Sequence, residues 1–320
     1  MARVFVTRPL PGTAVERLRA AGHEVTVHPG PLPPTRAELE AGVAEAEGLL
    51  CLLTEMIDAA LLDRAPRLRA IANYAVGSDN VDRAAATARG IPVGVTPDVL
   101  TDATADLAFA LILAVARRLS EGEALARSGS WDGWKPRELL GVSLAGKTLG
   151  IYGMGRIGRA VARRAALGFG MQVLYVNGEA VPEVEAALGA RQVALDDLLA
   201  GSDFVCVVLP LTAQTERMMG RREFALMRPG AIFINGSRGR IVDEAALIEA
   251  LQQGTIHGAG LDVFEREPLA PDNPLPGMAN VVALPHIGSA THETRYAMAQ
   301  QAVDNLLAGL RGERPLHLVS

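Results

Sequence analysis

Strand-like and helix-like segments alternate along almost the whole chain, and this alternation constrains the fold more than any other sequence feature. The strand-like segments of the first part are short and apolar: RVFVTR from Arg3, EVTVHP from Glu24, GLLCLL from Gly48, RAIANY from Arg69 and IPVGVT from Ile91. Helix-like segments between them cover residues 12–21, 36–46, 57–63 and 81–90. Repeated strand–helix units predict a parallel sheet with helices on its faces.

A second series of strand–helix units runs from Lys147 to about Pro285. It follows an apolar helix expected over residues 104–118 and an irregular segment, residues 129–146, which holds both tryptophans. A last helix is expected over residues 290–310. The 320 residues are enough for two domains. We expect one α/β domain from residues 1–100 and 287–320, with a second, residues 101–286, inserted into it.

Composition excludes several classes of function. The net charge of −5 provides no basic surface for nucleic acid or for an anionic membrane. Two cysteines, Cys51 and Cys206, lie in apolar strand-like segments and are expected to be buried free thiols, with no spacing that suggests a metal site. The N-terminus resembles a strand rather than a signal peptide, so we expect a cytoplasmic protein.

The segment GIYGMGRIGRAVARRAALGFG, from Gly150, has the spacing of a dinucleotide-binding turn. Gly153 allows the tight turn, Gly155 lets the backbone approach a pyrophosphate, and Gly158 permits close packing of a helix that starts near Arg156. The N-terminus of that helix, with Arg156 and Ile157 in its first turn, presents N–H groups to the phosphates. The turn follows a strand and opens an apolar helix, as this mechanism requires.

The end of the next strand lacks the acidic residue that usually binds the adenosine ribose. The chain has Val176, Asn177 and Gly178 there, so no carboxylate excludes a 2′-phosphate and no arginine follows to bind one. This difference argues against strict NAD specificity. It favours NADPH weakly, and a neutral pocket that accepts both cofactors is the alternative.

Three later segments place a polar residue after a strand: Arg238 in INGSRGRIVDE, Glu267 in GLDVFEREP and His286 in VVALPHIGSAT. Taken singly, each is more often a surface or structural residue. Together, at the strand ends where open α/β sheets bind ligands, they suit hydride transfer to a keto acid. Histidine can donate the proton, a carboxylate can orient it and favour its charged form, and arginine can hold a carboxylate.

The chain resembles the D-isomer-specific 2-hydroxyacid dehydrogenases over nearly its full length, and within them the glyoxylate/hydroxypyruvate reductase branch. The matching segments are NYAVGSDNVD, PDVLTDATADLAFALILAVARR, WDGWKP, GMGRIG, INGSRGRIVDE, GLDVFEREP and LPHIGSAT. The resemblance implies two Rossmann-like domains of parallel sheet, one flavodoxin-like and substrate-binding and one NAD(P)-binding, with an active-site cleft between them. It also implies that His286 is the acid/base, paired with Glu267, and that Arg238 binds the substrate.

The resemblance assigns further residues to substrate and cofactor. The N–H groups of Val76 and Gly77 would bind the substrate carboxylate and Leu53 would line the pocket, although a plain turn and a core residue are the structural alternatives. Asp262 would hold the nicotinamide carboxamide, and a purely structural aspartate is the alternative. The remaining cofactor contacts would be Thr104, Asn177, Pro210 and Thr212. Each of these roles has a structural alternative. The hydroxyl of Thr104 would instead bond within its own helix, and Pro210 and Thr212 would only form a turn.

The WDGWKP segment matches a dimer-forming stretch of that branch, in which Trp134 would reach the partner's substrate site. The alternative is that both tryptophans only fill an interface. We therefore expect a homodimer that reduces glyoxylate to glycolate and hydroxypyruvate to D-glycerate, preferring NADPH but also using NADH. The sequence leaves open a related dehydrogenase acting on 2-ketogluconate, phosphoglycerate or phosphonate, and a nonenzymatic NAD(H)-sensing protein like the corepressors of this fold.

Overall fold

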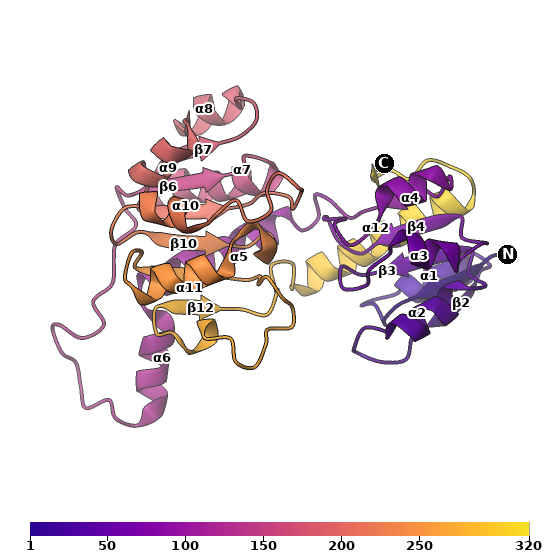
Figure 1. Cartoon of the computed structure of the whole chain (residues 1–320), viewed down its shortest axis with the longest axis horizontal. Helices are drawn as coiled ribbons and strands as arrows, with labels where there is room; N and C mark the ends of the chain where they lie inside the picture. Colours follow the sequence, from indigo (N-terminus) through magenta and orange to yellow (C-terminus); the bar gives the residue numbers. More distant parts are fainter. Residues whose placement is uncertain (320) are drawn as a thin grey trace. The chain divides into compact units, whose positions relative to one another are not determined.

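The computed structural model describes residues 1–319, and these form two compact units. Unit 1 comprises Met1–Leu100 and Ser289–Ser320, and unit 2 comprises Thr101–Gly288. The second boundary thus follows Gly288 rather than His286. Ser320, the last residue of the expected substrate-binding domain, lies outside the described residues. Figure 1 shows the helices and strands of both units, with colours that follow the sequence.

Unit 1 contains a sheet of six strands among the described residues, in the order β13-β5-β4-β3-β1-β2. The strands are β1 (Arg3–Val6), β2 (Glu24–Val27), β3 (Gly48–Cys51), β4 (Ala70–Asn73), β5 (Val93–Gly94) and β13 (Leu318–Val319). The helices are α1 (Ala14–Ala20), α2 (Arg36–Val43), α3 (Ala59–Asp63), α4 (Arg83–Ala88) and α12 (His292–Leu310). The order of the five parallel strands is that of flavodoxin-like folds, as expected.

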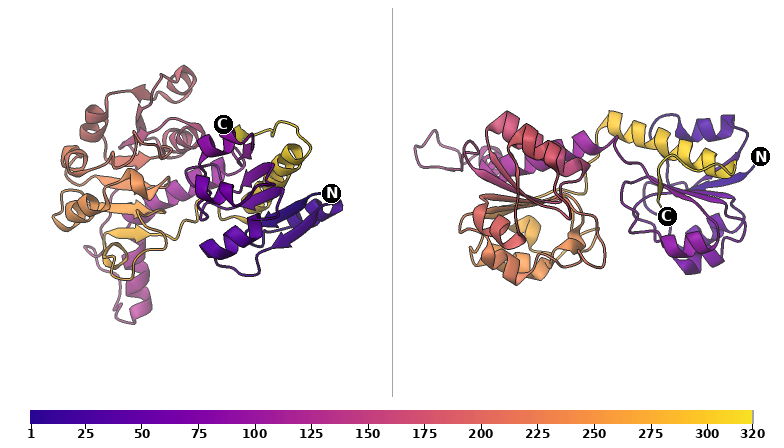
Figure 2. Two further views of the ribbon diagram at one scale, coloured as in Figure 1. Left: turned by 45° about the vertical axis from the view of Figure 1, so that its right-hand side comes forward. Right: turned by 90° about the horizontal axis from the view of Figure 1, so that it is seen from above.

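Strand β13 was not expected, and it pairs antiparallel with β5 at the edge of the sheet. Its two residues are too few to show the alternation by which a strand is recognised. Helix α12 packs on β3 and β4 from one face, together with α1, while α2, α3 and α4 contribute to the core on the other. Figure 2 shows helices on both sides of each sheet.

Unit 2 contains a sheet of seven strands within the described chain, in the order β12-β11-β10-β9-β6-β7-β8, all parallel. The strands are β6 (Thr148–Tyr152), β7 (Gln172–Val176), β8 (Arg191–Gln192), β9 (Phe204–Val207), β10 (Ile232–Asn235), β11 (Gly258–Leu261) and β12 (Val281–Ala283). The order reverses between β6 and β9, and this switch point is where such sheets bind ligands.

Helices cover both faces of the sheet of unit 2. The helices of unit 2 are α5 (Thr101–Ala116), α6 (Leu119–Ser128), α7 (Arg156–Arg163), α8 (Pro182–Leu188), α9 (Leu195–Gly201), α10 (Arg221–Leu226) and α11 (Glu244–Gln252), with one π-helical turn at Arg164–Gly168 and 3₁₀ turns at Gly239–Ile241 and Leu275–Gly277, and all of the helices but α6 pack on the sheet. One core joins α5, α7 and α8 to the sheet, and a second joins α9, α10 and α11 to its other face. Because helices cover both faces of this parallel sheet, the side chains on both sides of its strands are buried, and they are mostly apolar.

The helix expected over residues 104–118 differs at both ends. It begins at Thr101 and stops at Ala116, because Arg118 adopts a left-handed conformation with φ of 54°. A separate helix, α6, then follows, which the sequence analysis missed. None of its residues is buried, so it lacks the apolar face by which a helix is recognised. Within residues 1–319, no helix combines the length and the apolar character needed to cross a membrane.

Candidate active site

The candidate residues of unit 2 gather along one edge of its sheet. Gly153 follows β6, Asn177 follows β7, Pro210 follows β9, Arg238 follows β10 and Asp262 follows β11. His286 follows β12 in the same way. Because all seven strands are parallel, their carboxyl ends meet at this edge, which is where open α/β sheets bind ligands.

The glycine-rich turn has a geometric reason for each of its glycines. Gly153 has φ of 106°, a conformation that side chains disfavour, and a Cβ there would lie 2.6 Å from the carbonyl oxygen of Val208. A Cβ on Gly158 would lie 2.0 Å from the carbonyl oxygen of Gly153, so α7 packs directly on the turn. By contrast, a Cβ on Gly155 would meet no protein atom within 4 Å. The open side of the turn therefore suits a pyrophosphate.

Asn177 stands where an acid would bind ribose, but its side chain is already engaged by the protein. Its Oδ1 accepts the backbone N–H of Met154 at 3.2 Å, and its Nδ2 donates to the carbonyl of Glu179 at 2.9 Å. Asn177 thus ties the glycine-rich turn to the end of β7. Arg156 and Ile157 lie in the first turn of α7, where Arg156 is exposed and Ile157 half-buried.

The loop after β9 is organised by its own hydrogen bonds. The Thr215 hydroxyl donates to the carbonyl of Pro210 at 2.7 Å and accepts the backbone N–H of Thr212 at 2.8 Å. These hydrogen bonds fix the turn that carries Pro210 and Thr212, and the contact of both residues with a cofactor stays a prediction. Both residues are exposed at the carboxyl edge of the sheet.

His286 and Glu267 form a close pair. The Nδ1 atom of His286 lies 2.7 Å from Oε2 of Glu267, and the other carboxylate oxygen accepts the backbone N–H of Phe264 at 3.0 Å. Burial alone would raise the pKa of Glu267. The hydrogen bond and charge of His286, the Phe264 N–H and the charge of Arg238 outweigh it and hold this pKa below its usual value. An ionised carboxylate only accepts, so Nδ1 of His286 carries the proton.

Arg238 is half-buried on the loop after β10 and is held at its backbone. The buried side chain of Asn235 donates to the carbonyl of Arg238 at 3.0 Å and accepts the N–H of Ser237 at 3.1 Å. A Cβ on Gly239 would lie 1.8 Å from the carbonyl carbon of Phe264, so this loop is in close contact with the loop that carries Glu267. The sequence analysis missed Asn235, although a polar residue ending an apolar strand was a signal for it.

Asp262 is 1% exposed and binds backbone rather than side chains. Its two oxygens accept the N–H groups of Ile287 and Gly288, each at 2.7 Å. Burial raises the pKa of Asp262, against the opposing effect of these two N–H donors and of His286. Thr104, from the first turn of α5, is buried beside Gly288: a Cβ on that glycine would lie 3.5 Å from its methyl group.

The candidate residues of unit 1 lie at the carboxyl edge of its own sheet. Leu53 follows β3 and is half-buried, and Val76 and Gly77 follow β4, where Val76 is 39% exposed. A buried amide pair, Asn73 and Asn80, connects these two loops. Asn73 donates to the carbonyl of Gly77 at 2.8 Å and to Asn80 at 3.0 Å.

Asn80 completes this connection in unit 1. Its Nδ2 donates to the carbonyls of Leu52 at 2.9 Å and of Glu55 at 3.0 Å, the residues on either side of Leu53 and Thr54. The loop of Leu53 and the loop of Val76 are thus held in one arrangement by buried hydrogen bonds. The sequence analysis missed both asparagines.

Trp134 lies in the irregular segment after α6 and is 84% exposed, while Trp131 is 60% exposed and donates its indole N–H to the carbonyl of Gly133. Figure 1 shows α6 and this segment extending away from the sheet of their own unit. The two indoles line a shallow hollow with Leu125 of α6. They therefore present an unusual amount of aromatic surface.

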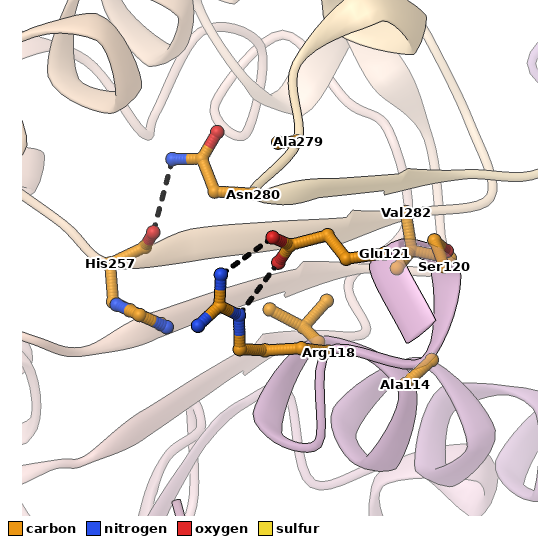
Figure 3. A pocket seen from close by; sticks show the side chains of 9 residues that line it. Ala114, Arg118, Ser120, Glu121, His257, Ala279, Asn280 and Val282 are labelled. Atoms are coloured by element: carbon orange, nitrogen blue, oxygen red, sulfur yellow. Dashed lines mark hydrogen bonds and ion pairs between the residues drawn. The ribbon is translucent and has the colours of Figure 1, made fainter. Parts of the chain in front are cut away.

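A cavity of about 290 Å³ lies at the opposite edge of the same sheet, where β11 and β12 begin. Its polar residues are Arg118, Ser120, Glu121, His257 and Asn280 (Figure 3). Arg118 donates to both oxygens of Glu121, at 2.8 and 2.6 Å, and Asn280 donates to the carbonyl of His257. The candidate catalytic groups are not among its lining residues, so this cavity is distinct from the candidate active site.

Comparison with known proteins identifies the family of this chain. Residues 109–288 match the family described as D-isomer specific 2-hydroxyacid dehydrogenase, NAD binding domain. A glyoxylate reductase from Thermococcus litoralis is 50% identical, covering 99% of this chain and 96% of its own. A glyoxylate/hydroxypyruvate reductase B from Shigella boydii is 51% identical, covering 97% of this chain and 95% of its own.

A solved structure shares the fold at full length. It is an NADPH-dependent glyoxylate/hydroxypyruvate reductase from Sinorhizobium meliloti in complex with NADP and malonate, with a TM-score of 0.87, 37% identity and coverage of 100% of this chain and 97% of its own. These matches confirm the resemblance that the sequence motifs predicted. The chain belongs to the D-isomer specific 2-hydroxyacid dehydrogenases.

Proposed function

We propose that this dehydrogenase reduces glyoxylate to glycolate and hydroxypyruvate to D-glycerate. The observation that carries the proposal is the His286–Glu267 pair, with Nδ1 of His286 held 2.7 Å from the carboxylate at the carboxyl edge of a dinucleotide-binding sheet. This arrangement leaves Nε2 as the ring atom that exchanges a proton with substrate. The names of the relatives from Thermococcus litoralis and Shigella boydii support the same substrates.

The residues of unit 2 would divide the chemistry between them. The bound reduced nicotinamide supplies a hydride to the keto carbon. His286 donates its Nε2 proton to the keto oxygen, which becomes the hydroxyl of the product, and the ring is left neutral. Glu267 orients the His286 ring through its hydrogen bond to Nδ1. Arg238 binds the substrate carboxylate and polarises the carbonyl through its forked, permanently charged side chain.

The residues of unit 1 would select the substrate. The backbone N–H groups of Val76 and Gly77 would bind the carboxylate, and Leu53 would limit the space for the substituent on the keto carbon. A small pocket favours glyoxylate and hydroxypyruvate over a bulky sugar acid such as 2-ketogluconate, because a larger group cannot enter it.

The cofactor is a nicotinamide dinucleotide, and we propose NADPH as the preferred form with NADH also used. Thr104, Pro210, Thr212 and Asp262 would contact it beside the glycine-rich turn, and Asn177 would adjoin its adenosine ribose. The absence of a carboxylate at Asn177 removes the repulsion that would exclude a 2′-phosphate. Arg156 is exposed in the first turn of α7, within the fingerprint turn. The relative from Sinorhizobium meliloti is itself NADPH-dependent.

We further propose a homodimer formed through the segment after α6. Support comes from its exposed apolar residues, Trp131 and Trp134 at 60% and 84%, with Leu140 at 64%. Such a surface is expected at an interface, and Trp134 would then reach the partner's substrate site. Analytical sedimentation of the wild type and of the Trp131→Ala/Trp134→Ala variant tests this proposal. We expect a dimeric wild type and a variant that dissociates, and a monomeric wild type would contradict the proposal.

We also propose a cytoplasmic location, which suits the two buried free thiols, Cys51 and Cys206.

The test of the proposed function is a steady-state assay that follows loss of reduced nicotinamide absorbance. NADPH and NADH are each combined with glyoxylate, hydroxypyruvate, pyruvate, 2-ketogluconate and phosphohydroxypyruvate. We expect fastest turnover of the first two acids, higher with NADPH. His286→Ala should lower kcat by about 10²–10⁴-fold while cofactor binding persists. His257→Ala is the control, because His257 precedes β11 at the opposite edge of the sheet, and it should leave kcat unchanged. Preference for a larger acid, or no turnover at all, would reject the proposal.

A further inference from the structure

The turn that carries Leu53 in unit 1 contains a buried carboxylate, that of Glu55. The turn begins at Leu52, directly after β3, and closes with a hydrogen bond of 3.4 Å from the N–H of Glu55 to the carbonyl of Leu52. Leu53 and Thr54 form its tip, where Leu53 is half-buried and Thr54 is exposed. The side chain of Glu55 is only 1% exposed, so it points into unit 1 and away from solvent.

Hydrogen-bond donors from two strand ends converge on this carboxylate. Its Oε2 atom accepts the backbone N–H of Leu52 at 2.6 Å and the hydroxyl of Thr7 at 2.7 Å. Its Oε1 atom accepts the hydroxyl of Thr54 at 2.6 Å and a guanidinium N–H of Arg8 at 3.3 Å. A buried carboxylate is tolerated only when it is bonded in this way. Both oxygens of Glu55 are therefore engaged by the protein.

The donors Thr7 and Arg8 belong to the neighbouring strand rather than to the turn. They directly follow β1, which pairs parallel with β3. The N–H of Thr7 donates to the carbonyl of Leu50 at 3.0 Å and so continues the pairing of the two strands. Because Thr7 is fully buried, its hydroxyl has a fixed place in the sheet. The Glu55 carboxylate thus ties the turn after β3 to the rigid end of β1.

The opposite side of the turn is held by Asn80, which donates to the carbonyls of Leu52 and Glu55. The turn is thus bonded from the β1 side through a carboxylate and from the β4 side through an amide. Leu53 has no polar side-chain group with which to fix its own position. Its place therefore depends on these bonds to the residues around it.

We propose that Glu55 is a positioning residue for the substrate pocket: its carboxylate fixes residues 52–55 against the end of β1 and thereby holds Leu53 beside the substituent on the keto carbon. This inference rests on the proposed role of Leu53 in that pocket. A pocket wall that is ordered before binding need not be ordered by the substrate, so it increases affinity.

Glu55→Met tests this anchor, because methionine fills a similar space in a core but lacks the two acceptor oxygens. We expect KM for hydroxypyruvate to rise about tenfold, as when the turn is correctly placed for only about a tenth of the time. KM for glyoxylate should rise less, because its keto carbon carries hydrogen instead of a hydroxymethyl group. Changes in kcat should stay within about twofold, since the acid/base pair lies in unit 2.

This split between KM and kcat distinguishes positioning from a loss of folded protein. Fewer folded molecules would lower the apparent kcat for both acids equally and leave both KM values unchanged. That result, or a wild-type ratio of the two KM values in Glu55→Met, would overturn the proposal. The dissociation constant of NADPH, followed by its fluorescence, should equal that of the wild type.

Two substitutions of Thr7 keep the proposal testable if Glu55→Met does not fold. Thr7→Val removes one donor to the carboxylate with little change of shape, whereas Thr7→Ser retains the hydroxyl. We expect a raised KM for hydroxypyruvate in Thr7→Val and a value near that of the wild type in Thr7→Ser. Equal KM values in these two variants would contradict the anchor.

Glu47→Met is the matched control. Glu47 directly precedes β3, and its carboxylate also accepts a backbone N–H, that of Arg3 at 3.2 Å, and an arginine, Arg69, at 3.3 Å. These contacts lie at the amino ends of β1 and β3, away from Leu53. The variant should therefore keep both KM values, and a change equal to that in Glu55→Met would reject a specific role for Glu55.

Hydrogen exchange of the backbone amides separates this inference from the proposed function, since it needs no substrate. The N–H of Leu52, which donates to Glu55, should exchange faster in Glu55→Met than in the wild type, while the amides within β3 keep their rates. If the wild type reduces no keto acid, the proposed function fails, but this measurement still decides whether Glu55 holds the turn. Unchanged exchange at Leu52, or equal acceleration throughout unit 1, rejects the anchor.

Discussion

At the scale of single residues, Glu267 illustrates how a partly exposed carboxylate acquires a defined role. One of its oxygens pairs with His286 and the other with the N–H of Phe264, and its side chain remains 33% exposed. Although burial opposes ionisation, these partners together lower the pKa of Glu267. The carboxylate is thus kept charged at neutral pH, where the imidazole needs an acceptor.

This lowered pKa predicts how stability depends on pH. A carboxyl group with a lower pKa in the native state stabilises it above the pKa of the unfolded chain, about 4.3 for Glu, and loses that contribution as pH falls through the native value. We therefore expect Glu267→Gln to be less stable than the wild type at pH 6, and the difference to disappear in acid. Urea unfolding between pH 3 and 6 measures it, and a difference that grows in acid would contradict the argument.

Asn177 leads to a prediction about cofactor choice. Asn177→Asp places a charge beside the adenosine ribose, where it binds the hydroxyls of NADH and repels the 2′-phosphate of NADPH. We expect the ratio of kcat/KM for NADPH over NADH to fall at least about tenfold, equivalent to 1.4 kcal/mol. Asn177→Ala is the control, because it removes the hydrogen bond to Met154 without adding charge. Equal effects of both variants would mean that the bond, and not the charge, governs the preference.

The sequence was enough to predict the chemical roles proposed for these residues, but not the contacts that they make. The residue types and their position after strands were enough to single out His286, Glu267 and Arg238, since every strand of a parallel sheet ends at the same edge. The partners of Asp262 and Asn177 could not be predicted. These bonds join positions 25 and 23 residues apart through backbone groups, which every residue type possesses.

At the scale of elements, the glycine-rich turn contains one glycine that is needed for packing, Gly158, and one that is proposed to be needed for binding, Gly155. A Cβ on Gly158 would lie 2.0 Å from the Gly153 carbonyl, so Gly158→Ala must displace α7 from the sheet. We expect a loss of about 1–3 kcal/mol in the free energy of unfolding, together with weaker binding of NADPH. Denaturant titration and fluorescence titration measure the two effects.

Gly155→Ala is the informative comparison. Its Cβ would meet no protein atom within 4 Å, and the backbone has φ of −74°. The cost to stability should stay below about 1 kcal/mol, since alanine is only a poorer N-cap than glycine. Affinity for NADPH should nevertheless fall, because the new methyl group occupies the space beside the phosphate-binding N–H groups. Unchanged affinity would mean that the pyrophosphate does not approach the turn at Gly155.

The elements that the sequence analysis missed share a physical property. Helix α6 buries none of its residues, and β13 comprises only Leu318 and Val319. Neither therefore shows the apolar periodicity that reveals an element. The expected helices and strands of the two sheets were found because one or both of their faces are buried, and their bounds shifted by a few residues where capping, as at Arg118, decides the end.

At the scale of the whole molecule, the proposed functions are divided between two units with separate cores. The proposed cofactor contacts and the acid/base pair all lie within Thr101–Gly288, whereas Leu53, Val76 and Gly77 belong to unit 1. Unit 2 is one continuous stretch of chain, and its sheet is covered on both faces by its own helices. A unit with a complete core and no chain break meets the requirements for folding alone.

Residues 101–288, expressed alone, should therefore fold cooperatively and bind NADPH with an affinity close to that of the full chain. They should not reduce glyoxylate measurably, because the groups proposed to bind its carboxylate in unit 1 are missing. Circular dichroism during urea unfolding tests the first expectation, fluorescence titration the second and the absorbance assay the third, each beside the full-length protein. Turnover by the fragment would show that unit 1 does not supply the substrate-binding groups. A folded fragment that fails to bind NADPH would show that the cofactor needs contacts beyond the glycine-rich turn and the strand ends of unit 2.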